Sequence, residues 1–408
     1  MEKPKIRFKG YQEDWEQRKL GEVCSEIGDG LHSAPEYDDN GKFYFINGNN
    51  LINGHIVINS KETKRVSEKT FEKNNKQLDD NTVLLSINGT IGNLAYYQGE
   101  PVMLGKSAAY LKANKIDKTF LYSLLQTTAV MNNFMLSLTG TTIKNLGLDA
   151  IKNTKISIPE LHEQKKIGLY FSQLDNLITL HQRKCEEMKI LKKYMLQKMF
   201  PQNGQLVPQI RFSGFTEDWE QRKFGDYNDL MTGYPFESDK FSEDGIKLVR
   251  GMNVKRGYLD FSEDICVKWN SCVGLENFLL KDGDILIQMD GALIGKSYAK
   301  IKENQLPALL VQRVTRARTN NKFASQDFMY QIIQRDFLRY IEMNKTETAV
   351  PHLSLNDIRN FEIMVPCLAE QKKIGDYFES LDHLITLHQQ KCDELRNIKK
   401  FMLQNMFI

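Results

Sequence analysis

Residues 161–200 read LHEQKKIGLYFSQLDNLITLHQRKCEEMKILKKYMLQKMF, and residues 368–407 read LAEQKKIGDYFESLDHLITLHQQKCDELRNIKKFMLQNMF. The two stretches are identical at 27 of 40 positions, so the chain carries one long segment twice. Apolar residues recur in each copy at alternating spacings of three and four, which is typical of a coiled-coil helix. At about 1.5 Å per residue, each helix would be about 60 Å long.

The apolar positions form one seam along each predicted helix, interrupted by one histidine and, just beyond the seven positions given next, by Lys192 in the first copy and Lys399 in the second. The seam comprises Ile167, Phe171, Leu174, Ile178, His181, Cys185 and Met188 in the first copy, and Ile374, Phe378, Leu381, Ile385, His388, Cys392 and Leu395 in the second. Because both helices carry the same seam, we expect them to pair antiparallel about a pseudo-twofold axis. The alternative is that each helix pairs with another subunit.

The expected register follows from placing the two helix centres, near residues 181 and 388, side by side. It brings together Leu174 and Leu395, Ile178 and Cys392, Cys185 and Ile385, and His181 and His388. It also sets Lys192 against Phe378 and Lys399 against Phe171, whose aromatic faces can accept a cation.

A shorter repeat begins each half of the chain. Residues 4–23 read PKIRFKGYQEDWEQRKLGEV, and residues 208–227 read PQIRFSGFTEDWEQRKFGDY. The segments between leader and helix share only scattered patches, so we call them the two bodies. We expect a leader and first body at 1–158, a long helix at 159–201, a leader and second body at 202–365, and a second long helix at 366–408. The helices are similar in the two halves, which suggests that they share one symmetric task. The bodies differ, which suggests that each has its own task. The alternative is that the body sequences simply diverged after a duplication.

Both bodies are predicted to be mixed α/β. Apolar runs at 83–87 and Ile285–Gln288 follow turn signals and predict strands, whereas 120–136 and 328–343 have helical spacing. The predicted fold class is therefore α+β, with two mixed α/β bodies in tandem, each followed by a long α-helix.

The composition excludes several classes of protein. No apolar run approaches the ~18 residues of a membrane span, and the N-terminal residues lack the apolar core of a signal peptide. Six cysteines without metal-site spacing suggest reduced thiols in a cytoplasmic protein and no metal. The glycine spacings around residues 291–297 and 99–107 miss the phosphate-binding loop by one residue each, and no Pro-Pro dipeptide exists for an amino-methyltransferase motif. We therefore expect no catalytic residue and no cofactor on this chain.

The loops of both bodies carry groups that can bond base edges. Arginine and lysine can bond guanine, asparagine and glutamine can bond adenine, and threonine can touch the thymine methyl. The candidates are His32, Asn47, Asn49, Asn50, Asn88, Thr141, Thr142 and Lys144 in the first body, and Tyr234, Arg250, Asn253, Lys255, Arg256, Gln288, Thr348 and His352 in the second.

The repeated motifs resemble those of a known family. Leaders of the form R-F-x-G-(F/Y)-x-E-D-W-E-x-R-K-x-G, a Pro-x-x-x-E-Q-K-K-I segment opening a long helix, and two divergent bodies resemble the DNA-specificity subunit of type I restriction–modification enzymes. The segment 311–314 (VQRV) resembles a strand motif of that family, whereas 105–108 (GKSA) departs from it.

The resemblance implies a non-catalytic subunit that binds double-stranded DNA, each body reading half of a split site. It implies two modification subunits, which methylate adenine with S-adenosylmethionine, and restriction subunits that use ATP and Mg²⁺. Both bodies are nearly neutral, which is unusual for a protein that binds many phosphates alone. We therefore expect charges segregated onto one face and backbone contacts shared with partner subunits. The alternative function is a two-headed scaffold that binds protein or glycan ligands.

Overall fold

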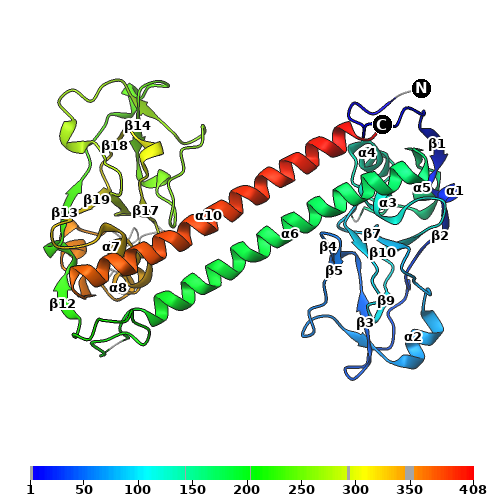
Figure 1. Cartoon of the computed structure of the whole chain (residues 1–408), viewed down its shortest axis with the longest axis horizontal. Coiled ribbons are helices and arrows are strands. Elements are labelled where there is room, and N and C mark those ends of the chain that lie inside the picture. Colours follow the sequence, from blue (N-terminus) through cyan, green and yellow to red (C-terminus); the bar gives the residue numbers. More distant parts are fainter. Residues whose placement is uncertain (1–2, 143, 203, 292–294, 345–352) are drawn as a thin grey trace. The chain divides into compact units, whose positions relative to one another are not determined.

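The computed structural model describes the chain except for residues 1–2, 143, 203, 292–294 and 345–352. The chain forms two compact units: the first holds residues 1–182 and 389–408, and the second holds residues 183–388. Helix α6 spans Leu161–Lys198 and helix α10 spans Leu368–Asn405, drawn in green and red in Figure 1. Each long helix therefore contributes one half to each unit.

The body of the first unit is built on an antiparallel four-stranded sheet of order β2-β10-β7-β8 and a three-stranded sheet of order β6-β3-β9. Its strands are β1 (Glu16–Lys19), β2 (Cys24–Asp29), β3 (Phe43–Ile46), β4 (Leu51–Ile52), β5 (His55–Ile56), β6 (Arg65–Val66), β7 (Thr82–Ser86), β8 (Leu94–Tyr96), β9 (Val102–Leu104), β10 (Ala108–Ala113) and β11 (Lys155–Ile158). Its shorter helices are α1 (Leu20–Val23), α2 (Glu68–Asn74), α3 (Lys118–Leu124), α4 (Thr128–Leu136) and α5 (Leu148–Asn153).

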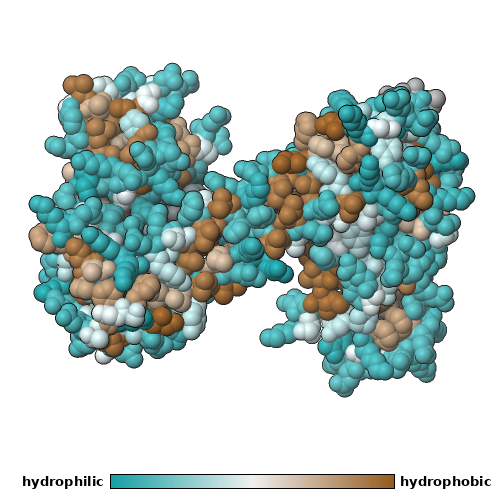
Figure 2. All heavy atoms as spheres, viewed as in Figure 1, coloured by the Kyte–Doolittle hydropathy of each residue, from teal (hydrophilic) through white to brown (hydrophobic). Residues whose placement is uncertain are grey.

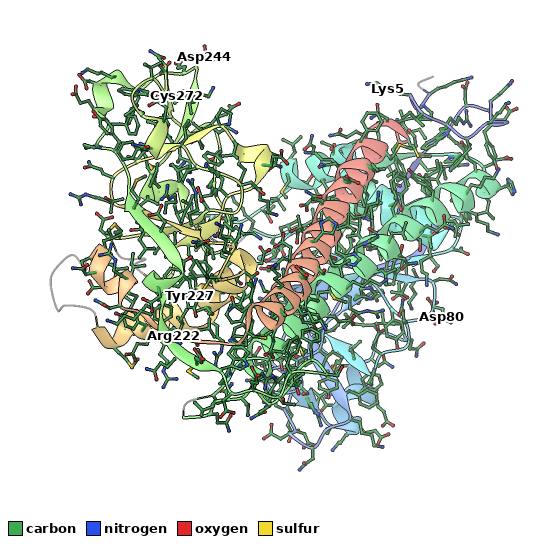
Figure 3. All side chains as sticks on the ribbon, turned by 60° about the vertical axis from the view of Figure 1, so that its left-hand side comes forward. Lys5, Asp80, Arg222, Tyr227, Asp244 and Cys272 are labelled. Atoms are coloured by element: carbon green, nitrogen blue, oxygen red, sulfur yellow. The ribbon has the colours of Figure 1, made fainter. Side chains whose placement is uncertain are left out.

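The body of the second unit repeats this topology, with a four-stranded sheet β13-β19-β16-β17 and a three-stranded sheet β15-β14-β18. Its strands are β12 (Glu220–Lys223), β13 (Asn228–Thr232), β14 (Ile246–Val249), β15 (Lys268–Trp269), β16 (Ile285–Gln288), β17 (Tyr298–Lys300), β18 (Ala308–Leu310), β19 (Val314–Thr319) and β20 (Glu362–Val365). Its shorter helices are α7 (Gln326–Ile332), α8 (Leu338–Asn344) and α9 (Leu355–Arg359). The three-stranded sheet carries loops distant from the long helices, where Figure 3 labels Asp244 and Cys272. The predicted α+β class is confirmed.

Buried ion pairs explain why the leader and the helix start are repeated together. Arg7 of the first leader donates through Nε and Nη2 to Glu163, with both N···O distances 2.7 Å. Arg211 of the second leader makes the same two-bonded contact with Glu370 at 2.8 Å. Both glutamate side chains are fully buried, so the arginine is their required counter-charge. Each pair fixes a leader to the first turn of a long helix.

The next glutamine in each repeat joins the long helix to its body. Gln164 donates to the Pro159 carbonyl at 2.8 Å and accepts from the Asp117 amide at 2.9 Å. At Gly168, one turn further along, an added Cβ would lie 2.0 Å from Thr119 Oγ1, so a residue with a side chain does not fit there. The helix can therefore approach the start of α3 closely, which places α3 and its sheet at a fixed position on α6.

Within each unit the two helix halves pair in the antiparallel direction, as predicted. The Cys185 thiol donates to the Ile385 carbonyl in the second unit, with a sulfur–oxygen distance of 3.8 Å. The Cys392 thiol donates to the Ile178 carbonyl in the first unit, at 3.7 Å. These contacts are related by a shift of 207 residues, so the same helix pairing recurs in both units. The His181–His388 pair would join the two units and stays a prediction.

The seam is largely buried, and it continues into the cores of the bodies. The seam residues that are less than 9 % exposed are Ile167, Phe171, Leu174, Ile178, Cys185, Ile374, Phe378, Leu381, Cys392 and Leu395. The remaining seam positions, His181, Met188, Ile385 and His388, are half-buried. A phenylalanine two residues beyond each long helix also packs on a leader tryptophan, with ring centroids 6.1 Å apart for Trp15 and Phe407 and 5.7 Å apart for Trp219 and Phe200.

The two seam lysines have partners other than the predicted phenylalanines. Lys192 Nζ lies 2.6 Å from a carboxylate oxygen of Asp382 and 2.8 Å from Gln334 Oε1. Lys399 Nζ makes the equivalent contacts with Asp175 at 2.6 Å and Gln126 at 2.7 Å. A half-buried ammonium is stabilised more by a carboxylate than by an aromatic face. The expected cation–π contacts of Lys192 with Phe378 and of Lys399 with Phe171 are therefore replaced by ion pairs.

The predicted helix at 120–136 is also corrected. The structure divides it into α3 and α4, because the Thr127 hydroxyl caps α4 by accepting from the Val130 amide. In the second body the corresponding segment continues through a wider turn at Ile333–Phe337 into α8. In the described part of the chain, no helix has the length and apolar character needed to cross a membrane.

Candidate nucleic-acid interface

A short turn leads into the central strand at the same place in both bodies. In the first body the Gly105 amide donates to the Ile46 carbonyl at 2.8 Å, and in the second the Val311 amide donates to the Val249 carbonyl at 3.1 Å. The segments 105–108 and 311–314 are therefore equivalent, although their sequences differ. Lys106 and Arg313 are both exposed on this turn.

Arg313 is held in an unusual conformation. Its φ of 68° lies in the left-handed region, which a residue with a Cβ adopts only at a cost. Its Nη1 lies 2.6 Å from the Asp290 carboxylate, while 67 % of the arginine side chain stays exposed. The next residue back, Gln312, donates its amide to the Tyr234 carbonyl at 2.9 Å. The turn thus orients a guanidinium whose other N–H groups face solvent and can bond a base edge.

The equivalent region of the first body is a hollow of about 480 Å³. Asp29, His32, Asn88, Lys106 and Asn145 contribute to its lining. His32 Nε2 lies 2.8 Å from the Asp29 carboxylate, and Asn88 Nδ2 lies 3.4 Å from Asn145 Oδ1. The polar groups of this hollow are two amides, a histidine–aspartate pair and Lys106, whereas the second body has an arginine–aspartate pair.

The loop beside this hollow carries three more of the predicted residues. Thr139 and Asn145 close the loop through two backbone hydrogen bonds of 2.9 Å. Thr141, Thr142 and Lys144 are exposed on it. The loop adjoins the hollow through Asn145, which lines it with His32 and Asn88, and through the Lys144 carbonyl, which accepts from the Gly89 amide at 3.4 Å.

A second hollow of the first body, of about 410 Å³, contains the three predicted asparagines. Asn47 Oδ1 accepts from the Ser107 hydroxyl at 3.0 Å, and Asn50 Oδ1 accepts from the Asn47 amide at 2.9 Å. These two side chains therefore stabilise a turn. Asn49 is exposed, with Tyr37 and Lys64 in the same lining.

The second body has the same turn, with different exposed groups. Asn253 is fully buried, accepts from the Arg250 amide at 3.0 Å and donates to the Asp260 carbonyl at 2.9 Å. The Arg250 guanidinium donates to the Ile265 carbonyl at 2.6 Å and lies over the Phe241 ring. Asn253 and Arg250 are thus engaged within the body, as Asn47 and Asn50 are in the first.

The remaining candidates of the second body are spread over two places. Tyr234 is 39 % exposed and lies beside the Arg313 turn, and Gln288 is half-buried against Gly251. Lys255 is half-buried and Arg256 is exposed on a separate loop. Thr348 and His352 lie outside the described residues.

Five polar residues at these sites were not among the predicted candidates: Lys106, Asn145, Asp290, Gln312 and Arg313. The sequence signal that could have identified these residues is the difference between 105–108 and 311–314, two segments that lead into equivalent central strands. Among the described residues, no group of three or more His, Cys, Asp or Glu is placed to hold a metal ion.

Comparisons with known proteins agree on one family. A family model described as type I restriction modification DNA specificity domain matches residues 12–189 and 216–397. The type I restriction enzyme MjaVIII specificity subunit of Methanocaldococcus jannaschii is 25 % identical over 401 residues, covering 95 % of this chain and 91 % of the relative. The EcoAI specificity subunit of Escherichia coli is 28 % identical over 187 residues, covering 45 % of this chain and 30 % of the relative.

A solved structure supports the fold. The crystal structure of a type I restriction-modification S subunit from M. genitalium aligns with a TM-score of 0.69 at 17 % identity, covering all of this chain and 99 % of the other. At that identity the likeness concerns the fold alone. The tandem arrangement of two bodies with long helices is therefore shared with that protein.

Proposed function

The chain belongs to the type I restriction–modification DNA specificity family, and on this premise we propose that each body reads one half of a bipartite, asymmetric DNA site. The observation that carries the proposal is the pair of equivalent turns before the central strands. One topology presents Lys106 with amides in the first body and Arg313 with Asp290 in the second. Because the two equivalent turns carry different donors, they would select different bases, so the two half-sites would differ in sequence.

We propose that the chemistry belongs to partner subunits. Two modification subunits would methylate adenine using S-adenosylmethionine, and restriction subunits would use ATP and Mg²⁺ to cut. The repeated ion pairs that fix leaders to helices support a framework role for this chain. Its place of action would be the cytoplasm, where the DNA substrate and these partners are found.

Exposed apolar residues on the long helices support docking of two partners. Leucine, isoleucine and aromatic side chains that are 37–55 % exposed recur along each long helix. They are Leu177, Leu180, Ile398 and Phe401 in the first unit, and Leu384, Leu387, Leu191 and Tyr194 in the second. Every member of the second set lies 207 residues from a member of the first. Figure 2 shows hydrophobic residues gathered along the helices. Two equal apolar surfaces suit two copies of one partner.

The proposal is tested by an electrophoretic shift with duplex DNA, in the presence and absence of a modification subunit. We expect binding that depends on the partner, and methylation at one split sequence when genomic DNA of expressing cells is sequenced. A two-headed scaffold for protein or glycan would show neither partner-dependent DNA binding nor a methylated site.

A further inference from the structure

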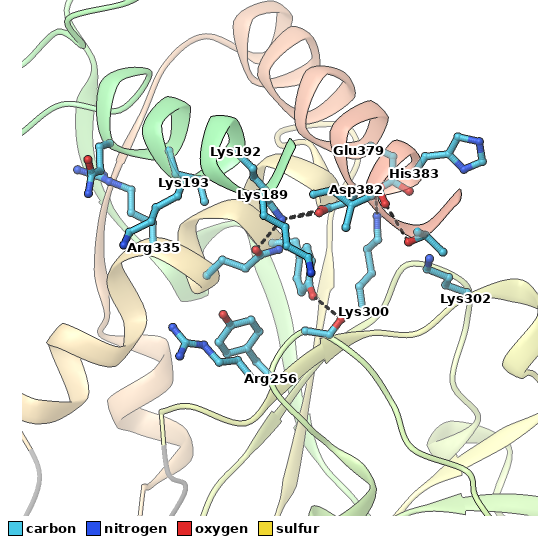
Figure 4. Close-up of a pocket in the computed structure, with 18 residues that line it drawn as sticks. Lys189, Lys192, Lys193, Arg256, Lys300, Lys302, Arg335, Glu379, Asp382 and His383 are labelled. Carbon is cyan, nitrogen blue, oxygen red and sulfur yellow. Dashed lines mark hydrogen bonds and ion pairs between the residues drawn. The ribbon is translucent and has the colours of Figure 1, made fainter. Parts of the chain in front are cut away.

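The second unit contains a cavity of about 880 Å³ between its body and its halves of the long helices. Seven cationic side chains line the cavity, together with the carboxylates of Glu379 and Asp382. Figure 4 shows these groups converging from α6, from α10 and from the body. Positive charge therefore exceeds negative charge by a wide margin at this one place, in a body that is nearly neutral as a whole.

Three of the cations are neutralised within the protein. Lys192 pairs with Asp382, as described above. Lys300 Nζ lies 2.5 Å from carboxylate oxygens of both Asp327 and Glu379. Arg335 Nη1 lies 2.9 Å from Asp336. These pairs use both carboxylates of the cavity lining, so those groups are not available to the other cations.

The other four cations have no ion pair with any described residue: Lys189, Lys193, Arg256 and Lys302. Lys189 and Lys193 lie one helical turn apart on α6, where like charges repel each other. Arg256 and Tyr298 line the same cavity, and the charge of Arg256 opposes the rise in the pKa of Tyr298 that burial causes. All four of these side chains are exposed to solvent, so an anion of several charges could pair with them together.

We propose that this cavity binds the phosphodiester backbone of DNA beside the half-site that the second body reads; the inference rests on the proposed function. Lysine ammonium groups bind phosphates as point charges, and arginine can bond two phosphate oxygens at once. The cations come from a helix and from two loops of the body, so the ligand is an extended polyanion with successive charges. Duplex DNA carries one charge per ~1.7 Å of its axis and meets that requirement.

The first unit has only part of this site. Arg396 and Lys400 on α10 correspond to Lys189 and Lys193 by the shift of 207 residues. The strand position of Lys300, which pairs with Ile285, is occupied in the first body by Tyr96, which pairs with Val83. The residue two positions later is Gln98 in place of Lys302, and the residue before the equivalent glycine is Asn53 in place of Arg256. At these three positions the body contributes cations only in the second unit, and the two half-sites are expected to differ in backbone contacts.

The test measures DNA affinity of the complex with modification subunits, by fluorescence anisotropy, between 50 and 200 mM salt. The variants are the body pair Arg256→Gln/Lys302→Gln and the helix pair Lys189→Gln/Lys193→Gln. Two lost phosphate contacts lower the slope of log affinity against log salt by about 1.8, so the affinity loss over this range shrinks about 12-fold. The decrease in this slope should be the same for duplex DNA with the methylated sequence and for duplex DNA of random sequence. The matched control, Arg396→Gln/Lys400→Gln, should change the slope less than either pair.

Three results would overturn the inference. The first is an unchanged slope for both pairs in complexes that still bind DNA. The second is loss of subunit assembly, seen by native mass spectrometry, which would make the cavity a subunit contact. The third is binding of inorganic tripolyphosphate that the variants abolish while DNA binding stays intact, which would assign the cavity to a free polyphosphate. A parent complex that binds no DNA at all would instead refute the proposed function.

Discussion

At the scale of single residues, the buried ion pair of each leader is the contact with the largest expected effect on stability. Removing Arg7 by Arg7→Ala leaves the carboxylate of Glu163 buried without a counter-charge. We expect the free energy of unfolding to fall by about 3–5 kcal/mol, measured by urea denaturation. The control is Arg18→Ala, because Arg18 pairs with Glu16 at a site where both side chains are about half exposed. A surface pair contributes about 0–1 kcal/mol, so equal losses in both variants would contradict the assignment.

Arg313 is the residue most suited to reading a base in the second half-site. Its guanidinium is oriented by Asp290 and open to solvent, so it matches the two acceptors of guanine in the major groove. We expect Arg313→Ala to relax one position of the second half-site, at a cost of about 1–3 kcal/mol, with the first half-site unchanged. Sequencing of methylated DNA measures this directly. Equal weakening of every sequence would identify a phosphate contact instead.

At the scale of elements, periodicity made the long helices and their antiparallel pairing predictable. A strong heptad pattern specifies which face is buried, so the contacts of Cys185 and Cys392 followed from the sequence. The break between α3 and α4 at Thr127 could not be predicted from the sequence, because one hydroxyl cap interrupts an otherwise helical pattern. The carboxylate partners of Lys192 and Lys399 were missed because they lie off the seam.

The candidate site was less predictable than the framework, for a physical reason. Polar residue type does not distinguish a side chain that caps a turn from one that faces solvent. Asn253 and Arg313 illustrate the two errors: the first was a predicted base reader and is fully buried in a turn, whereas the second was not predicted and is exposed. The two roles are separated by whether the side chain itself bonds the backbone of its loop, as Asn253 does.

The exposed apolar residues of the long helices predict which substitutions prevent binding of a modification subunit. Leu177→Glu/Leu180→Glu places two charges on the surface of the first unit, and Leu384→Glu/Leu387→Glu does the same in the second. We expect each double variant to bind one modification subunit in place of two, because a charge at an apolar interface is costly to desolvate. Native mass spectrometry counts the subunits. Exposed polar positions on α6 provide the control, and Glu186→Gln/Glu187→Gln should keep both partners.

At the scale of the whole molecule, both long helices run from one unit into the other. If their length sets the distance between the half-sites, four residues inserted after Gln182 and four after His388 should lengthen the spacer. The added length is about 6 Å, which corresponds to one or two base pairs of B-DNA. Sequencing of methylated DNA should show the new spacer with both half-sites unchanged. Methylation at the original spacer would show that another element sets the distance.

The buried thiols of the paired helices allow the opening of the helix pair to be measured as a rate of alkylation. Cys185 and Cys392 are buried and bonded to carbonyls across the helix pair, so an alkylating reagent can reach them only when the helices separate. Cys367 is exposed and serves as the fast reference, whereas burial raises the pKa of Cys24 to about 12 and leaves almost no thiolate at pH 8. The labelling rate of the two seam cysteines therefore measures how often the helix pair opens, and a bound partner that spans both helices should slow it.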